Sequence, residues 1–296
     1  MKLTRRQSLW ILAGNAAAAA ASESLQDVWQ RIARETDGTV GAAALDIGSS
    51  HIVSLNGDDR FPMASVCKLP IAMHMLALVD EGKLARDQDI EVLPQDVVRS
   101  VSPIAERWPA ERRFRVDEMI ELMVARSDNT AVETFFRMEG PAIGARVRSW
   151  TAGGVRVDRP ESQCNRDRRA NLQQFLKDPR DTGTPAGTVQ LLARLFRGEL
   201  LSAPSTARLI EILKATTTFP TRLKGLLPSG TVVAHKTGSS GVDDGMAAAT
   251  NDSGVIFLPG GRQLAVSVYI KASTKSDEVR DSIIARISRA AFDAYR

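Results

Sequence analysis

The sequence predicts an α/β protein in which an antiparallel sheet is flanked by N- and C-terminal helices and an all-helical domain is inserted. Three observations support this fold class: strand-like alternation near both ends of the chain, helical periodicity between them, and amphipathic segments outside the two strand regions. The chain has 296 residues, enough for a sizeable core. We therefore assign residues 23–60 and 208–296 to a discontinuous α/β domain and residues 61–207 to the helical domain.

Residues 1–22 have the pattern of an export signal. A basic start is followed by an apolar run from Leu9 to Ala16 and by small residues up to Ser22. The run is too short to span a bilayer comfortably. Arg5 and Arg6 fit a twin-arginine signal, although a Sec signal that happens to carry two arginines fits them as well. We expect a bacterial protein that is periplasmic or secreted and has no stable membrane anchor.

Charge and metal-ligand content exclude several partner classes. The formal net charge is +4, and Lys2, Arg5 and Arg6 are the charged residues of the signal, so 4 minus 3 leaves about +1 for the mature chain. A net charge this small does not indicate a nucleic-acid-binding protein. With three histidines and no Cys/His cluster of ligand spacing, we expect no zinc and no cofactor. We expect the protein to be a monomer, and we expect its partner to be a small-molecule substrate.

The elements follow from periodicity. Apolar residues at helical spacing predict a first helix around Trp29 and a closing helix around Ile284. Alternation and turn residues predict five strands, at Thr39 to Ile47, His51 to Leu55, Thr231 to Lys236, Ala247 to Leu258 and Gln263 to Ala272. Between the second and third strands the pattern is mainly helical, with long connections at 92–103 and 155–185.

Ser65 and Lys68 form the first candidate catalytic pair. They stand at i and i+3, so they share one face of a helix whose apolar residues continue to a stop at Gly82. A serine hydroxyl is a poor nucleophile, and a lysine amine with a depressed pKa can accept its proton. Alone, the Ser-x-x-Lys pattern is weak, since it arises by chance about once in a chain of this size.

Two further motifs strengthen this interpretation. Ser127-Asp128-Asn129 and Lys236-Thr237-Gly238 follow in order, and together the three motifs resemble those of class A β-lactamases and penicillin-binding proteins. Between them, Arg159 to Asn165 resembles the Ω loop of class A β-lactamases, with the pattern Arg-x-Glu-x-x-x-Asn. The resemblance covers essentially the whole mature chain, which is identified as similar to class A serine β-lactamases.

The resemblance implies hydrolysis of penicillins or cephalosporins through an acyl-enzyme, and thereby antibiotic resistance. Ser65 would attack the lactam carbonyl, and Lys68 would take its proton directly or through a water that bridges to Glu161. Ser127 would pass a proton to the leaving nitrogen. Glu161 would activate the hydrolytic water, positioned by Asn165.

The same resemblance implies a set of substrate-binding residues. Asn129 would orient the substrate amide, while a group of side chains near the third motif would hold the substrate carboxylate. That group consists of Lys236, Thr237, Ser239 and, as an additional cation, Arg222. A solvated arginine with no role in binding remains the alternative for Arg222.

Two other functions share the three motifs: a DD-peptidase or transpeptidase that acts on cell-wall peptides, and a penicillin sensor that is acylated without turnover. Glu161 with Asn165 separates them from a β-lactamase, because a dedicated base is what makes the acyl-enzyme short-lived.

The two cysteines, Cys67 and Cys164, are expected to lie close together beneath the site. An oxidising compartment favours a disulfide between them, whereas buried cysteines also persist as small hydrophobic residues. The sequence leaves both possibilities open.

Overall fold

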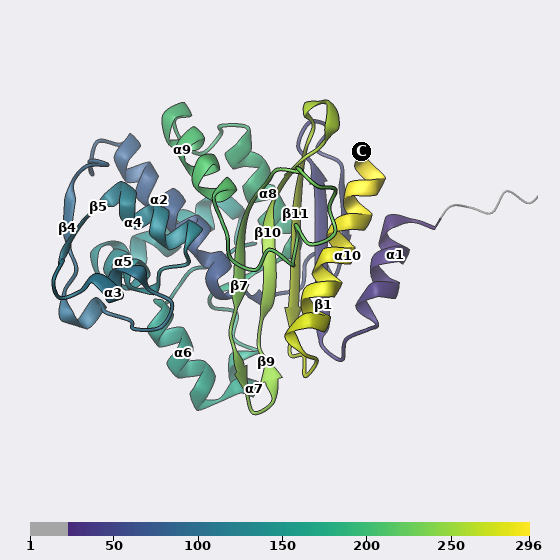
Figure 1. The fold of residues 1–296 in the computed structure, drawn as a ribbon, viewed down its shortest axis with the longest axis horizontal. Helices are drawn as coiled ribbons and strands as arrows, with labels where there is room; N and C mark the ends of the chain where they lie inside the picture. Colours follow the sequence, from purple (N-terminus) through teal and green to yellow (C-terminus); the bar gives the residue numbers. More distant parts are fainter. Residues whose placement is uncertain (1–22) are drawn as a thin grey trace, which may run out of the picture.

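The computed structural model describes residues 23–296 as an α/β fold with a five-stranded antiparallel sheet, which confirms the predicted class (Figure 1). The export signal predicted for residues 1–22 lies outside the described residues. The helices are α1 (Leu25–Ala33), α2 (Lys68–Asp80), α3 (Pro103–Arg107), α4 (Val116–Ala125), α5 (Asn129–Thr151), α6 (Glu161–Ala170), α7 (Leu172–Phe175), α8 (Pro185–Phe196), α9 (Ala203–Lys214) and α10 (Asp277–Tyr295). The main-sheet strands are β1 (Thr39–Asp46), β2 (Ile52–Leu55), β7 (Val233–Ser239), β10 (Thr250–Phe257) and β11 (Gln263–Lys271).

The sheet joins the two ends of the chain. Its strand order is β2-β1-β11-β10-β7, so the N-terminal hairpin pairs with the C-terminal strand β11, from Thr39 opposite Lys271 to Asp46 opposite Leu264. Four short strands form separate pairs: β3 (Phe61–Pro62) with β6 (Thr182–Gly183), and β4 (Asp89–Glu91) with β5 (Arg113–Arg115). A further pair, β8 (Val242–Asp243) with β9 (Met246–Ala247), forms a hairpin beyond β7.

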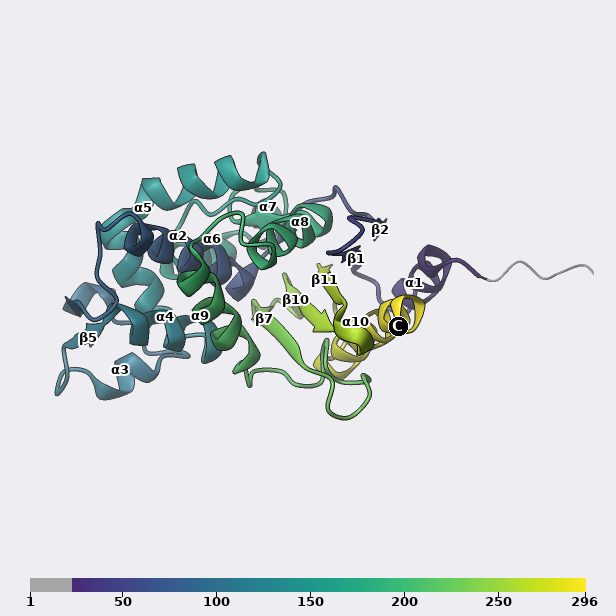
Figure 2. The ribbon, with the colours of Figure 1, turned by 90° about the horizontal axis from the view of Figure 1, so that it is seen from above.

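The sheet has an apolar core on each face, as alternation along β11 requires. Leu264, Val266, Val268 and Ile270 point to α1 and α10, whereas Ala265 and Tyr269 face α8 and the helical layer. Figure 2 shows α1 and α10 on one side of the sheet and α8 on the other.

The helical layer is built around α2, which contacts α4, α5 and α9. Its residues from Lys68 to Leu78 are all buried, as expected of a helix that is apolar on every side. The predicted domain boundary at residues 207 and 208 falls inside α9, and α8, from the predicted helical segment, packs on β1 and β11.

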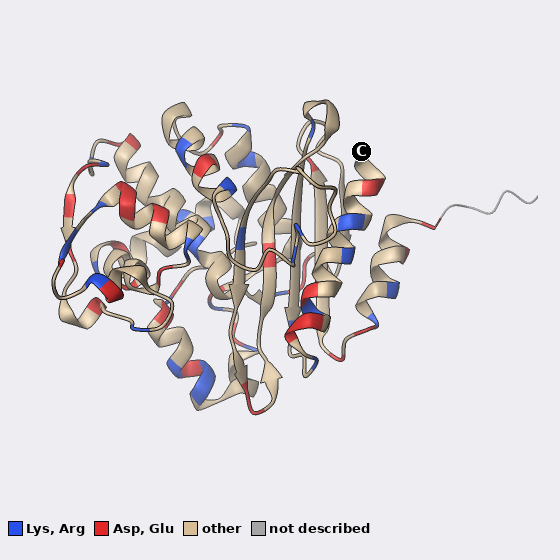
Figure 3. Cartoon of the chain, in the orientation of Figure 1, with Lys and Arg blue, Asp and Glu red and all other residues tan. Residues whose placement is uncertain are grey.

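Two local predictions need correction. The segment 155–185, expected as a long connection between helices, itself contains α6 and α7. Basic residues gather in the C-terminal half of α6 (Figure 3).

Ser65 lies not in an α-helix but in a 3₁₀ turn, η1 (Ala64–Cys67), and the α-helix starts at Lys68. Pro70, which has no backbone N–H to donate, is consistent with this tighter first turn.

Within residues 23–296, no helix is both long enough and apolar enough to cross a membrane.

Candidate active site

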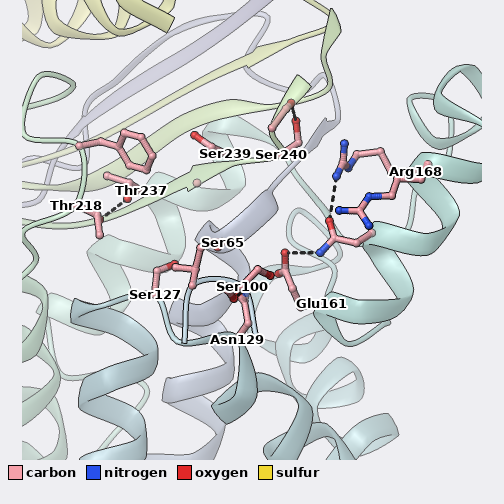
Figure 4. A pocket seen from close by; sticks show the side chains of 16 residues that line it. Ser65, Ser100, Ser127, Asn129, Glu161, Arg168, Thr218, Thr237, Ser239 and Ser240 are labelled. Atoms are coloured by element: carbon pink, nitrogen blue, oxygen red, sulfur yellow. Dashed lines mark hydrogen bonds between the residues drawn. The ribbon is translucent and has the colours of Figure 1, made fainter. Parts of the chain in front are cut away.

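The predicted residues converge on one cavity of about 560 Å³ between the helical layer and β7 (Figure 4). The cavity wall includes seven of the ten predicted site residues: Ser65, Ser127, Asn129, Glu161, Asn165, Thr237 and Ser239. Lys68 and Lys236 are fully buried and reach the site from beneath. Arg222 does not line the cavity.

Lys68 connects the two serines of the first and second motifs. Its Nζ lies 3.0 Å from Ser65 Oγ, 3.1 Å from Ser127 Oγ and 2.7 Å from the Ser127 carbonyl oxygen, and it also donates to Asn129 Oδ1. These contacts place the amine where it can exchange a proton with either hydroxyl. The side-chain amide of Asn129 is held at its other end, where Nδ2 donates to the Ser100 carbonyl oxygen at 2.9 Å.

The turn that carries Ser65 is held against the sheet by β7 and β10. A Cβ atom added at Gly238 would come within 2.6 Å of the Met63 carbonyl oxygen and 3.1 Å of the Ser65 nitrogen, so the third motif needs its glycine for this close approach. The buried Asn251 donates hydrogen bonds of 2.9 Å to the carbonyl oxygens of Pro62 and Met63. Ser65 therefore sits on a turn that contacts from both β7 and β10 hold in place.

The second motif closes the opposite wall. Asp128 is fully buried and caps α5 by accepting from the Ala131 nitrogen at 2.9 Å, and it also accepts from the Ile104 nitrogen at 2.8 Å and from the Ser102 hydroxyl at 3.0 Å. Ser127 adopts a positive φ of 59°. Its Oγ lies 3.2 Å from Lys236 Nζ, so this hydroxyl has a lysine on each side.

Burial controls the charge of both lysines. Burial lowers the pKa of Lys68, and the negative charge of Glu161 partly offsets this shift by favouring the charged amine. Burial and then the Lys68 charge lower the pKa of Lys236 to about 7. Both amines are therefore shifted toward the neutral form that accepts protons.

Glu161 and Asn165 face the cavity from α6. Pro160 precedes the helix and Glu161 is its first residue, so Asn165 follows one turn later at i+4. Asn165 Nδ2 donates to Glu161 Oε1 at 3.2 Å, which orients the carboxylate and the amide toward the same space. The expected pair is thus present, on a helix and not in a loop.

Two carboxylates anchor the segment that carries α6. Asp181 accepts from Arg159 Nε at 2.6 Å and from its backbone N–H at 2.9 Å, which ties the two ends of the segment together. Glu133, on α5, accepts from the backbone N–H of Ser162 at 2.7 Å and from its hydroxyl at 2.9 Å. The start of α6 is therefore fixed to the helix that begins with Asn129.

The β7 end of the cavity offers hydroxyls. Thr237 Oγ1 lies 2.6 Å from Thr218 Oγ1, and Ser239 Oγ accepts from Arg222 Nη2 at 2.7 Å. Arg222 is only 1% exposed and also binds Asp281 and the carbonyl oxygens of Gly238 and Asn251. This geometry favours a role for Arg222 in holding Ser239 rather than direct contact with a ligand.

Cys67 and Cys164 line a common small cavity of about 30 Å³ beneath the site, and both thiols are free. The two cysteines are therefore close together but form no disulfide. Cys164 Sγ lies 3.4 Å from Asp181 Oδ2, and burial raises the pKa of both thiols.

Sequence reasoning missed several residues that shape the site. Asn251 interrupts a predicted strand with an amide that strands disfavour, and Glu133 lies at i+4 from Asn129, so both left a weak signal. Arg168, Arg169 and Thr218 line the cavity with no motif to indicate it. In the described part of the chain, no group of three or more His, Cys, Asp or Glu residues is placed to hold a metal ion.

Comparison with known proteins gives consistent matches over the chain. The family model described as the β-lactamase enzyme family matches residues 22–295. The extended-spectrum β-lactamase PER-1 of Pseudomonas aeruginosa is 35% identical over 258 residues, which cover 86% of this chain and 82% of that protein. β-Lactamase VEB-1 of the same organism is 31% identical over 271 residues, or 90% and 88% of the two chains. A solved β-lactamase from Chitinophaga pinensis superposes with a TM-score of 0.85 at 33% identity, covering 92% of this chain and 99% of that one.

Proposed function

The chain belongs to the β-lactamase enzyme family and is a serine β-lactamase of class A that hydrolyses β-lactams and confers resistance to them, and we propose that Ser65 is its nucleophile. The observation that carries this assignment is the buried Lys68 amine, within 3.1 Å of both Ser65 Oγ and Ser127 Oγ. A lysine with a lowered pKa at this position can relay the proton that the nucleophile loses.

In the proposed acylation step, Ser65 Oγ attacks the lactam carbonyl and its proton passes to Lys68, directly or through a water bridging to Glu161. Backbone N–H groups of Ser65 and Ser239 stabilise the oxyanion; the close approach of β7 to the nucleophile turn at Gly238 supports this arrangement. Ser127 then delivers a proton to the leaving nitrogen, as its position between two lysines supports.

In the proposed deacylation step, Glu161 removes a proton from a water that Asn165 helps to position, and the resulting hydroxide attacks the ester carbonyl. The bond from that carbon to Ser65 Oγ then breaks, and the proton held by Glu161 returns to Ser65 Oγ. The hydrogen bond between Asn165 and Glu161 supports this role. The segment from Arg159 to Asp181 would then act as the Ω loop of this enzyme, with α6 as its main element.

For substrate binding, we assign Lys236, Thr237 and Ser239 to the ring carboxylate, and Asn129 to the substrate amide. Arg222 contributes through Ser239, since its guanidinium is committed to protein partners. The half-buried hydroxyl of Ser239, which lines the cavity, and the Lys236 charge provide the groups that complement a carboxylate.

We propose that the mature enzyme is exported to the periplasm or secreted and works as a monomer. The basic and apolar pattern of residues 1–22 supports export, and Arg5 with Arg6 supports the twin-arginine route.

Hydrolysis of a chromogenic cephalosporin by the purified mature protein tests the function. We expect multiple turnovers per protein molecule, and no turnover in the Ser65→Ala variant with an unchanged circular dichroism spectrum. A single stoichiometric burst by the wild-type protein would point instead to a penicillin sensor or a peptidase.

A further inference from the structure

The cavity has two chemically different ends. Thr218 and Thr237 lie on one side of Ser65, and Arg168 lies on the other (Figure 4). If the ring carboxylate occupies the threonine end, as proposed above, the acyl substituent of the lactam extends toward the arginine end.

Helical spacing places a cation at that end. Glu161, Asn165 and Arg169 stand at i, i+4 and i+8 on α6, so they share one face, which is the face that lines the cavity. Arg166 falls on a different face of the same helix and does not line the cavity; its Nη2 donates to Gln163 at 2.7 Å.

The two arginines of the cavity wall differ in the interactions that their side chains make with the rest of the protein. Arg168 is 5% exposed, pairs with Asp243 on the β8–β9 hairpin, and donates to Asn165 Oδ1 at 3.2 Å. It therefore connects α6 to the hairpin as a fixed wall with its charge compensated. Arg169 is exposed, and within residues 23–296 its side chain makes no ion pair and no hydrogen bond.

We propose that Arg169, supported by the Arg168–Asp243 pair, binds a second carboxylate carried on the acyl side chain of the substrate. The preferred substrates are accordingly dianionic β-lactams, which have one carboxylate on the ring system and one on the side chain. The inference rests on the proposed function and deepens it, because it assigns the substrate class of the same site.

Charge and geometry both favour this assignment. An arginine fork matches a carboxylate with two parallel N–H···O bonds, and an arginine keeps its charge over the working pH range of an enzyme. Glu161 is the negative group of the same wall, but it accepts a hydrogen bond from Asn165 and lies about two helical turns before Arg169 on α6. The Asp243 charge is matched by Arg168.

The test uses two penicillins that differ by one carboxylate: benzylpenicillin and α-carboxybenzylpenicillin. We expect the Arg169→Met variant to lose about five- to twentyfold more kcat/KM for the carboxylated substrate than for benzylpenicillin, mainly through KM. Arg169→Lys should recover part of the difference, and raising the salt concentration should reduce it in the wild type. The matched control is Arg166→Met, an exposed arginine of α6 outside the cavity, which should leave the ratio between the substrates unchanged.

Equal losses on both penicillins in Arg169→Met, or the same ratio change in Arg166→Met, would overturn the inference while leaving β-lactam hydrolysis intact. Failure of the wild-type protein to hydrolyse either penicillin would overturn both the inference and the proposed function.

Discussion

Glu133 accepts two hydrogen bonds from Ser162, one from the backbone N–H at 2.7 Å and one from the hydroxyl at 2.9 Å. Glu133 lies one turn into α5, which begins with Asn129, and Ser162 follows Glu161 at the start of α6. The pair therefore connects the substrate-binding wall of the cavity to the helix that carries the proposed deacylation base. Because a carboxylate near a helix N-terminus also interacts favourably with the exposed N–H groups, it fixes where α6 begins.

The Glu133→Ala variant should slow deacylation more than acylation. Without the carboxylate, the first turn of α6 is free to shift, and small displacements of a catalytic group are costly. We expect deacylation to fall by about tenfold or more, seen as a larger steady-state fraction of acylated protein in intact-protein mass spectrometry. Glu211→Ala, an exposed glutamate on α9, is the matched control. Equal slowing of both steps would contradict a specific role for Glu133.

The pH profile of kcat/KM should report the charge of Lys236. Burial and the Lys68 charge lower the pKa of this amine to about 7, so the free enzyme loses the positive charge as pH rises through that value. Substrates held by their ring carboxylate should therefore show kcat/KM falling on the alkaline side. An arginine remains charged, so Lys236→Arg should remove this limb, whereas the exposed Lys275→Arg should not. An alkaline limb that is identical in Lys236→Arg would show that another group titrates.

Arg222 should matter for stability as well as for binding. Its guanidinium is 1% exposed and pairs with Asp281, so Arg222→Ala removes the positive partner of a partly buried carboxylate and the hydrogen bonds that Arg222 donates to two carbonyl oxygens. We expect the free energy of unfolding to fall by about 3 kcal/mol or more in chemical denaturation. The partly exposed Arg286, which pairs with Glu35, is the control, and Arg286→Ala should cost about 1 kcal/mol or less. A similar small cost for both variants would contradict the buried role.

Thiol titration should find two free cysteines per chain. Cys67 and Cys164 share a small cavity without a bond, and burial raises the pKa of both thiols. Reaction with a thiol reagent should be slow in the native protein and should reach two equivalents after unfolding without reductant. Loss of both equivalents in protein purified from an oxidising compartment would instead establish a disulfide.

The strands and the outer helices were predictable because their periodicity is strong and local. The five main strands end within three residues of their predicted limits, and the motif residues meet in one cavity. The polar segment after Pro160 was harder to interpret. Its residues lack an apolar stripe, and α6 is stabilised by partners distant in sequence, such as Glu133 and Asp243, so helical periodicity of apolar residues could not identify it.

The role of Arg222 could not be read from the sequence for a related reason. An arginine near a strand fits a ligand contact, a solvated position and a buried network equally well, and the choice depends on contacts with Asp281 and Asn251 that only the folded chain brings together. Nearby Ser239 was easier to assign, because it directly follows the Lys236-Thr237-Gly238 motif that carries the resemblance.

The most direct test of the central assignment is intact-protein mass spectrometry of the Glu161→Ala variant after brief exposure to benzylpenicillin. With Ser65 and Lys68 in place and the proposed base removed, the variant should accumulate one penicilloyl adduct per chain, located on the peptide that contains Ser65. The double variant that also carries Ser65→Ala should show no adduct. An adduct that clears from Glu161→Ala as fast as from the wild type, or one that forms without Ser65, would contradict the account.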